Sequence, residues 1–553
     1  MLPMTPTKLS RMRPLRLVLL SLVGVLCSSC LTKEQAIAEV DAEAYDAIAE
    51  KQEAFYGSRP AFRVEPSQHR VVLDAIDEAT GQVIPGKSLS LNLATILDIA
   101  AVNSRTFQQS KENLFRSALA LMREREDFRL RPAGLFDGSV SSSRSSETLS
   151  SGTEFGITRL LETGGSYALS AGLDFFRFLN NPTSETLASF INLSITLPFL
   201  RNAGREVAYE NLVQADRDLL YGLRSFERFK QTHGVDVISR YLRVLSQSQR
   251  IVNEEANLRS LELARQQAED RFAEGRTRGF EVDQNLQAEL RGKSRLINAR
   301  QSLEAALDNL KDLIGVPVDL PVTISIEDLK ALDALLLGND ELTETKLITA
   351  ALKNRLDFRN VVDAVADRGR RVHVAENQLL PDFTLRLNAR PVSDGLRPLR
   401  YNYQDGTYSA NFDMDLALDR DLESIALRSS IIDMEAALRN QEDSREGVKF
   451  DVRQALRNLK QSLENYQVAQ SALKLANKRV FSTQELRDLN RATTRDFLEA
   501  QDALVSSEND LVDAKVAYRI AYLELLRDIG VIAVSPEGLD HDTSHTLLKE
   551  ALQ

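Results

Sequence analysis

Two short stretches of the chain place pairs of carboxylates at the start of a helical pattern. NRATTRDFLEAQDAL carries Asp496 and Glu499, and the earlier EGRTRGFEVDQNLQAEL carries Glu281 and Asp283. Asp496 and Glu499 are three residues apart and share one face of a helix. Carboxylates in such positions complement the positive end of a helix dipole, or they line a passage that favours cations. The surrounding elements decide between these interpretations.

The rest of the chain offers little catalytic or metal-binding chemistry. Its five histidines are scattered, and its two cysteines, Cys27 and Cys30, both lie near the N-terminus. No Ser–His–Asp arrangement and no phosphate-binding glycine loop stands out. We therefore predict that the protein is not an enzyme and that it binds no cofactor or metal.

The composition favours long helices over a compact enzyme core. The chain has 553 residues, of which 43% are hydrophobic and 27% charged, and it contains no Trp. These fractions exclude general disorder. The net charge of −11 argues against binding to nucleic acid.

The N-terminus has the pattern of a bacterial lipoprotein signal. A basic segment is followed by LVLLSLVGVL, an apolar run of ten residues that is too short to span a bilayer, and then by CSSC. We predict removal of residues 1–29 and lipidation of Cys30. Ordinary signal-peptidase cleavage nearby is the alternative.

The remainder of the chain is two copies of one unit. A shift of 215 residues places Gly315 and Val316 on Gly530 and Val531. The same shift pairs identical residues along the preceding helix: Ile314 with Ile529, Leu310 with Leu525, Ala306 with Ala521, Ala299 with Ala514 and Leu296 with Leu511. Identities at helical spacing without a gap indicate an internal duplication.

This duplication sets the predicted boundaries. We predict a lipid-anchored N-terminal segment at 30–88, a first repeat at 89–316, a connector at 317–344, a second repeat at 345–532 and a polar tail at 533–553.

Each copy is predicted to contain a helix, a strand-rich stretch, a long helix, a break and a further helix. The strand-rich stretches lie at about 128–200 and 383–418 and alternate polar with apolar residues. This alternation suits a soluble sheet or the wall of a transmembrane β-barrel. The stretches at about 201–270 and 421–490 contain no proline, and helices of that length span roughly 100 Å. Such helices must pack side by side, as in a coiled coil or a helical barrel.

The strands set a condition on assembly. About two strands per copy predict about four per chain, and four strands cannot close a barrel. Open sheet edges are not tolerated in lipid. If the strands cross a membrane, three chains would pool about twelve of them, within the range of membrane barrels.

The order and spacing of several motifs resemble the TolC family of outer-membrane efflux proteins. The motifs are ITLPFLRNAGR (195–205), RFAEGRTRGFEV (271–282), ALKNRLDFRNVVDAV (351–365), AENQLLPDFTL (375–385) and the paired ends LIGV and DIGV. The resemblance covers about residues 90–532. It implies a homotrimer with a twelve-stranded outer-membrane barrel, continued across the periplasm by an α-helical tunnel. It also implies a periplasmic adaptor protein and an inner-membrane pump as partners in efflux or export.

The resemblance also assigns residues to the periplasmic tip of the tunnel. The constriction would contain Asp496, Glu499, Glu281 and Asp283, and the helix hairpins would turn at Gly275 and Asn490. Some members of the family close the entrance with an arginine just after the turn, where this chain has Ala492. A lipid-anchored periplasmic coiled-coil adaptor or scaffold is the alternative function. An adaptor should carry a single helical hairpin, which the duplication argues against.

Overall fold

The computed structural model describes residues 32–57, 62–64, 84, 88–93, 95–143, 147–179, 185–325, 328, 343–394, 397–416, 418–489, 491–532, 534–535 and 538–539. The predicted leader, the lipidation site Cys30 and the predicted turn residue Asn490 lie outside the described residues. So do most of the connector and of the C-terminal tail.

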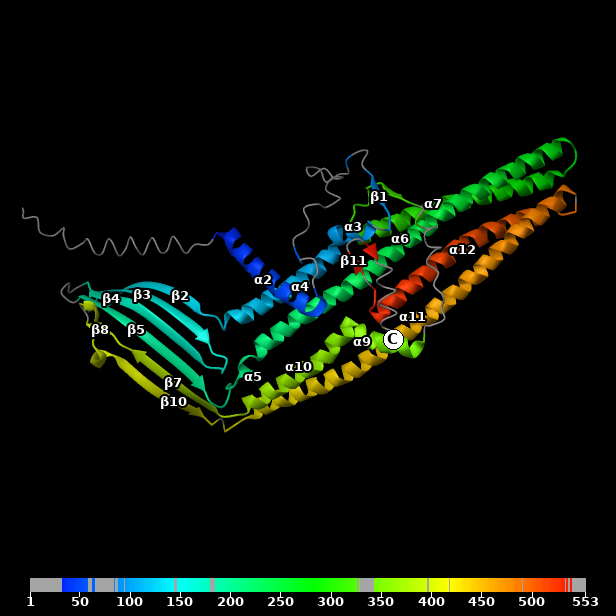
Figure 1. Ribbon diagram of the computed structural model, residues 1–553. Coiled ribbons are helices and arrows are strands. Elements are labelled where there is room, and N and C mark those ends of the chain that lie inside the picture. Colours follow the sequence, from blue (N-terminus) through cyan, green and yellow to red (C-terminus); the bar gives the residue numbers. More distant parts are fainter. Residues whose placement is uncertain are drawn as a thin grey trace, which may run out of the picture.

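The first copy runs from short helices through four strands to a long helical hairpin (Figure 1). Its elements are β1 (Leu89–Leu91), α3 (Ile96–Asn103), α4 (Arg105–Glu126), β2 (Arg131–Ser142), β3 (Glu147–Leu160), β4 (Ser166–Phe178), β5 (Glu185–Pro198), α5 (Arg205–Ala208), α6 (Glu210–Ala273) and α7 (Gly279–Ile314). Helix α2 (Lys33–Tyr56) precedes it in the N-terminal segment, and β6 (Val322–Ile324) follows it in the connector.

The second copy repeats this plan with two long strands. Its elements are α9 (Glu344–Asn354), α10 (Leu356–Gln378), β7 (Asp382–Arg390), β8 (Ser393–Asp394), β9 (Arg397–Tyr401), a 3-10 turn (Tyr403–Asp405), β10 (Thr407–Asp415), α11 (Asp421–Asp488) and α12 (Thr494–Ile529). Two short strands follow in the tail, β11 (Val534–Ser535) and β12 (Gly538–Leu539).

The molecule is elongated, with the main sheet at one end and the tips of two helical hairpins at the other (Figure 1). Helices α6 and α11 have 64 and 68 residues and so extend about 100 Å. At the tip end α6 pairs with α7, α11 pairs with α12, and α12 packs against α6. At the sheet end α6 lies between α4 and α10, and α10 also contacts α11. Four helices therefore lie abreast where the chain enters the sheet.

The main sheet has six strands in the order β10-β7-β5-β4-β3-β2, and all neighbours are antiparallel. The expectation of about two strands in each copy is wrong for the first copy, which contributes four. The error arises in β2 and β3, whose many Ser and Gly residues are poor strand formers. Long antiparallel pairing overrides that weak preference. Three such chains would bring eighteen strands together, not the twelve predicted.

The largest core cluster lies midway along the molecule, where the two copies meet. It collects side chains from both copies, among them Ile99, Tyr241, Ile314, Leu347 and Leu526. The buried apolar residues join the short helices α3 and α9 to the long helices. The two halves are therefore held as one body at this level.

The recurring Gly–Val pair has a structural cause at this core. Gly315 ends α7 with a left-handed φ of 73°, and Gly530 ends α12 with φ of 80°. A Cβ on Gly315 would lie 2.1 Å from the carbonyl oxygen of Asn103, and one on Gly530 would lie 3.1–3.2 Å from the backbone of Asn354 and Arg355. Each glycine packs against the break between two helices of its own copy, where a side chain has no room.

Candidate functional site

The main sheet has one apolar and one polar face. Across β10 and β7 the paired apolar residues are Tyr408 with Ala389, Ala410 with Leu387, Phe412 with Leu385 and Met414 with Phe383. The alternate pairs are Thr407 with Arg390, Ser409 with Asn388, Asn411 with Arg386 and Asp413 with Thr384. Paired residues point to the same side of a sheet, so the two chemistries are separated by the pleat.

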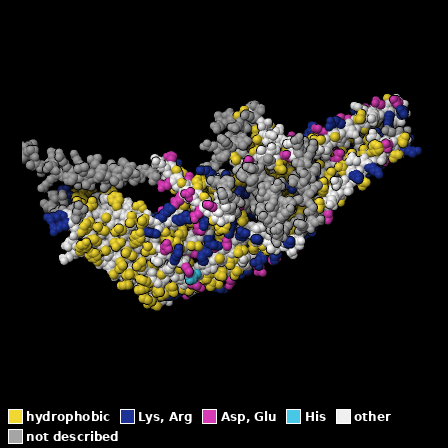
Figure 2. Space-filling view, in the orientation of Figure 1, with side chains coloured by type: hydrophobic (Ala, Val, Ile, Leu, Met, Phe, Trp, Pro, Cys, Tyr) yellow, Lys and Arg dark blue, Asp and Glu magenta, His cyan; other side chains and the backbone are white. Residues whose placement is uncertain are grey.

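The same two faces continue through the rest of the sheet. The apolar face includes Leu197, Ile195, Leu193 and Ile191 of β5, Tyr167, Leu169, Ala171, Leu173 and Phe175 of β4, Ile157 and Phe155 of β3, and Phe136 and Val140 of β2. The polar face includes Thr196, Ser194 and Asn192 of β5, Ser170 and Asp174 of β4, Thr158 and Glu154 of β3, and Asp137 and Ser139 of β2. Figure 2 shows hydrophobic side chains gathered over the sheet and charged ones over the helices.

The apolar face is exposed in the single chain. Phe412 is 67% exposed and Phe136 is 64% exposed. A contiguous exposed apolar face marks a surface that another phase or molecule covers. On the opposite face, Arg386 forms an ion pair with Asp413 at 3.0 Å, and Arg390 forms one with Asp174 at 3.4 Å. The arrangement suits a wall with hydrocarbon on one side and water on the other.

At the opposite end of the molecule, Asp496 caps α12. Its carboxylate accepts hydrogen bonds from the backbone nitrogen of Thr493 at 2.9 Å and from the Thr493 hydroxyl at 2.7 Å. The Thr493 hydroxyl in turn accepts from the backbone nitrogen of Asp496 at 3.2 Å. This is a capping box, whose Thr-x-x-Asp spacing is readable in the sequence. The prediction of a constriction missed that signal.

Glu281 joins the tips of the two hairpins. Its Oε2 accepts a hydrogen bond from the hydroxyl of Thr277 at 2.8 Å, within its own hairpin. The same atom accepts from the hydroxyl of Thr494, in the other hairpin, at 3.0 Å. Glu281 is thus a link between the two copies as well as an acid at the tip.

The other two acids have different surroundings. Glu499 accepts a hydrogen bond from Arg479 of α11 at 3.1 Å, and Asp283 is exposed on α7. The structure therefore brings Glu281 toward α12 but gives Asp496 and Glu499 local partners. Gly275 lies in the turn between α6 and α7 with φ of 71°. In the other turn, Arg491 and Ala492 donate their backbone N–H groups to the carbonyl of Leu486.

The capping box predicts how the tip responds to acid. The Thr493 hydroxyl, and next its backbone amide, hold the pKa of Asp496 below its usual range. A lowered folded-state pKa contributes stability above the unfolded value of about 3.9, and that contribution is lost as pH falls through the folded pKa. We expect hydrogen-exchange protection factors in the first turn of α12 to be constant from about pH 7 to 5 and to fall below about pH 4. In the control, Asp496→Asn, that drop should be absent; an equal drop in both proteins would contradict the capping role.

Comparisons with solved structures identify the architecture. CusC, from crystal structures concerned with folding and transmembrane channel formation, aligns with a TM-score of 0.59 and 14% identity over 80% of this chain and 93% of its own. The Campylobacter jejuni outer-membrane channel CmeC aligns with a TM-score of 0.58 and 14% identity over 83% and 89%. The open-state outer-membrane channel MtrE of Neisseria gonorrhoeae aligns with a TM-score of 0.57 and 15% identity over 79% and 88%.

The chain has the fold of the TolC family. This confirms the fold indicated by the sequence motifs. No family model matches the chain, and no curated protein matches its sequence. The TolC fold is therefore recognised in this chain through its structure and through the order of short motifs.

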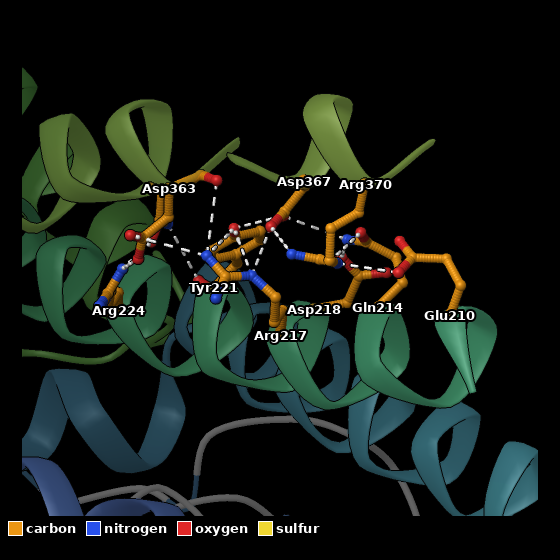
Figure 3. A network of polar contacts seen from close by, with 10 residues as sticks. Glu210, Gln214, Arg217, Asp218, Tyr221, Arg224, Asp363, Asp367 and Arg370 are labelled. Atoms are coloured by element: carbon orange, nitrogen blue, oxygen red, sulfur yellow. Dashed lines mark hydrogen bonds and ion pairs between the residues drawn. The ribbon is translucent and has the colours of Figure 1, made fainter. Parts of the chain in front are cut away.

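One feature of this TolC fold was not predicted, a polar network between α6 and α10 (Figure 3). Arg370 forms ion pairs with Glu210 at 2.8 Å and with Asp367 at 2.9 Å. Arg217 forms an ion pair with Asp367, and the Tyr221 hydroxyl donates a hydrogen bond to it. The network continues through Arg224 and Asp363, which are 2.6 Å apart.

The network is partly removed from water. Burial, followed by the hydrogen bond to Asp367, raises the pKa of Tyr221 to about 12. The charged residues recur three to seven residues apart along one face of each helix, and this spacing is visible in the sequence. The helix that carries their partners is about 150 residues away in the chain, so the sequence does not show which charges pair. The network joins the first copy to the second just below the sheet.

Within the described ranges no group of three or more His, Cys, Asp and Glu side chains could hold a metal ion. No helix among these residues is long and apolar enough to cross a membrane.

Proposed function

We propose that the protein is an outer-membrane channel for efflux or export of substrates from the periplasm or from an inner-membrane pump. The observation that carries this proposal is the sheet with one continuous apolar face and one polar face. Strands of 9–14 residues are long enough to cross a bilayer at a tilt. A periplasmic adaptor or scaffold would leave that apolar face in water, which disfavours the alternative.

The assembly is proposed to be a homotrimer in which each chain supplies part of the barrel and part of the tunnel. Among the described residues the outer edges of β2 and β10 have no strand partner, which supports it because a membrane sheet must close. The long hairpins would extend into the periplasm toward an adaptor protein and an inner-membrane pump. Lipidation of Cys30 would add an anchor at the N-terminus.

The constriction is proposed to lie at the hairpin tips, with Asp496, Glu499, Glu281 and Asp283 around the axis and the turns at Gly275 and Asn490. Their position at the end remote from the sheet supports the assignment. A threefold ring of such acids would favour cations over anions. Asp283, Asp496 and Glu499 are exposed and Glu281 is half-buried, so capping and pairing within the chain leave these carboxylates able to act on passing ions.

Single-channel recording tests both parts of this proposal. Detergent-extracted protein in planar bilayers is expected to conduct, with a preference for cations. In Asp496→Ala/Glu499→Ala we expect a change of about twofold or more in conductance or in the cation-to-anion permeability ratio, because a ring of charge has been removed. The matched control is Glu442→Ala/Asp443→Ala, which removes two exposed acids of α11 far from the tip.

The outcomes separate the two parts. A pore that the tip substitutions leave unchanged would return Asp496 to a capping role and Glu499 to its pairing with Arg479. Absence of any pore, from protein whose helical circular dichroism is intact, would contradict the channel itself.

A further inference from the structure

The extra hairpin of the first copy, β2–β3, changes the size of the proposed barrel. We propose that all six strands of each chain enter the barrel wall, with β2 of one copy paired to β10 of the next, so that three copies close an eighteen-stranded barrel. This inference rests on the proposed trimeric channel. It replaces the expectation of twelve strands.

The two outer edges of the six-stranded sheet are suited to each other. Every neighbouring pair from β10 to β2 is antiparallel, and six is an even number, so the edge strands run in opposite directions. Pairing β2 with β10 of a second copy therefore continues the same antiparallel pattern. β2 begins shortly after α4 ends, and β10 ends shortly before α11 begins. The first residue of β2 and the last residue of β10 consequently both lie at the end of the sheet nearest the helices.

A twelve-stranded wall would require the sheet to be taken apart. In that arrangement β4 would pair with β10 of the next copy, and β2–β3 would leave the wall. Yet β3 and β4 pair at thirteen positions, from Thr148 with Phe178 to Leu160 with Ser166, and this ladder is as extensive as the one between β4 and β5. Every hydrogen bond of that ladder would have to be exchanged for one with another chain.

The hairpin also has the side-chain pattern of a wall element. On β2, Phe136 and Val140 lie on the apolar face and are 64% and 69% exposed. Asp137 and Ser139 lie on the polar face. A hairpin displaced from the wall would have no reason to keep the same two faces in register with the other strands.

The register of the sheet gives a barrel geometry that closes. Crossing from the last residue of β10 to the first of β2, the paired positions are Asp415 with Asp382, Thr384 with Pro198, Thr196 with Ser166, Ser166 with Leu160 and Thr158 with Arg131. To continue from one pair to the next, one must step two residues along the strand, away from the helices, in each of β7, β5 and β3, whereas no step is needed in β4. The total stagger is therefore six residues over the six strands. If Arg131 meets Asp415 of the next copy, the stagger equals the strand number, which corresponds to a strand tilt of about 36°. Membrane barrels have tilts of about 35–45°.

The width of six tilted strands matches the width of the helices that follow them. Six strands about 4.8 Å apart and tilted about 36° occupy about 36 Å of circumference. The four helices that lie abreast below them, α4, α6, α10 and α11, occupy about 32–40 Å at the usual spacing of about 8–10 Å. Four strands would occupy only about 24 Å. At this tilt six strands match the width of the four helices, whereas four strands fall short of it.

Cysteine cross-linking distinguishes the two seams. The natural cysteines are Cys27 and Cys30 only, so the barrel has none. The seam is the proposed contact between β10 of one copy and β2 of the next. If Arg131 meets Asp415 in this seam, Asn411 of β10 lies opposite Leu135 of β2. If the stagger at the seam is larger by two residues, Asn411 lies opposite Asp137 instead. In a twelve-stranded wall Asn411 would instead lie opposite Ser170 of β4. All four side chains lie on the polar face, and within one chain Asn411 is at least three strands away from the others.

The pairs are tested by oxidation in isolated outer membranes and by gel electrophoresis. We expect Asn411→Cys with Leu135→Cys or Asp137→Cys to give covalent dimers and trimers, and Asn411→Cys alone or with Ser170→Cys to give none. Cross-linking only through Ser170→Cys would overturn the eighteen-stranded barrel and keep the trimeric channel. A trimer by mass that none of the pairs links would also overturn the β2–β10 seam. A monomer by mass would overturn the proposed trimer itself.

Discussion

An arginine at Leu387 is expected to destabilise the membrane form severely, whereas an arginine at the adjacent Asn388 is tolerated. Leu387 lies on the apolar face, paired with Ala410 and Ile195. Asn388 lies on the polar face, paired with Ser409 and Ser194. Arginine on a lipid-facing strand position costs about 2–4 kcal/mol near the bilayer centre, which is about a 30- to 700-fold change in the folding equilibrium.

Urea unfolding of the protein in lipid vesicles measures this difference. The two variants insert the same side chain into the same strand one residue apart, so strand propensity and net charge are matched. We expect the midpoint of Leu387→Arg to fall well below that of Asn388→Arg. Equal midpoints would show that the apolar face of the sheet does not contact hydrocarbon.

Removal of the Asp367 carboxylate is the second large effect. The side chain of Asp367 is 7% exposed and pairs with Arg217 and Arg370, which are 26% and 30% exposed. Breaking a buried ion pair by deleting one partner costs about 3–5 kcal/mol, because the remaining charge is left without compensation. The arginines keep some solvent here, so we expect Asp367→Ala to lower the free energy of unfolding by about 2–3 kcal/mol.

The control for this substitution is Glu344→Ala. Glu344 pairs with Arg453, and the two side chains are 47% and 51% exposed. Loss of such a surface pair should cost below about 1 kcal/mol. The chain has no Trp, so the helical circular dichroism signal is the natural probe of unfolding. A cost for Asp367→Ala no larger than that of the control would mean that the network between α6 and α10 contributes little to stability.

Features repeated along the sequence were the most predictable. The proline-free runs predicted at about 201–270 and 421–490 correspond to α6 and α11, and the Gly–Val pairs lie at the ends of α7 and α12. These features depend on local chemistry, namely helical spacing, helix breakers and left-handed caps. The alternation of apolar and polar residues likewise located the strand-rich stretches.

Features that depend on long-range pairing were not predicted. The β2–β3 hairpin is rich in Ser and Gly, so its strand character comes from its neighbours more than from its own residues. The network around Asp367 needs two helices to be placed side by side before its charges acquire partners. At the tip, the spacing from Thr493 to Asp496 was readable as a cap, whereas the link from Glu281 to Thr494 spans the two copies.

The pairing of β5 with β7 determines when the sheet can be completed during synthesis. Leu193 meets Ala389 and Pro198 meets Thr384, so about 190 residues separate the partners in the chain. Contacts this distant form late, because a long loop must close before they contribute stability. If the chain is exported as proposed, the four strands of the first copy leave the inner membrane with an apolar face and an edge that awaits β7, and they remain so until α6, α7, α9 and α10 have followed. We expect a nascent chain in this state to be prone to aggregation and to require a holding chaperone in the periplasm.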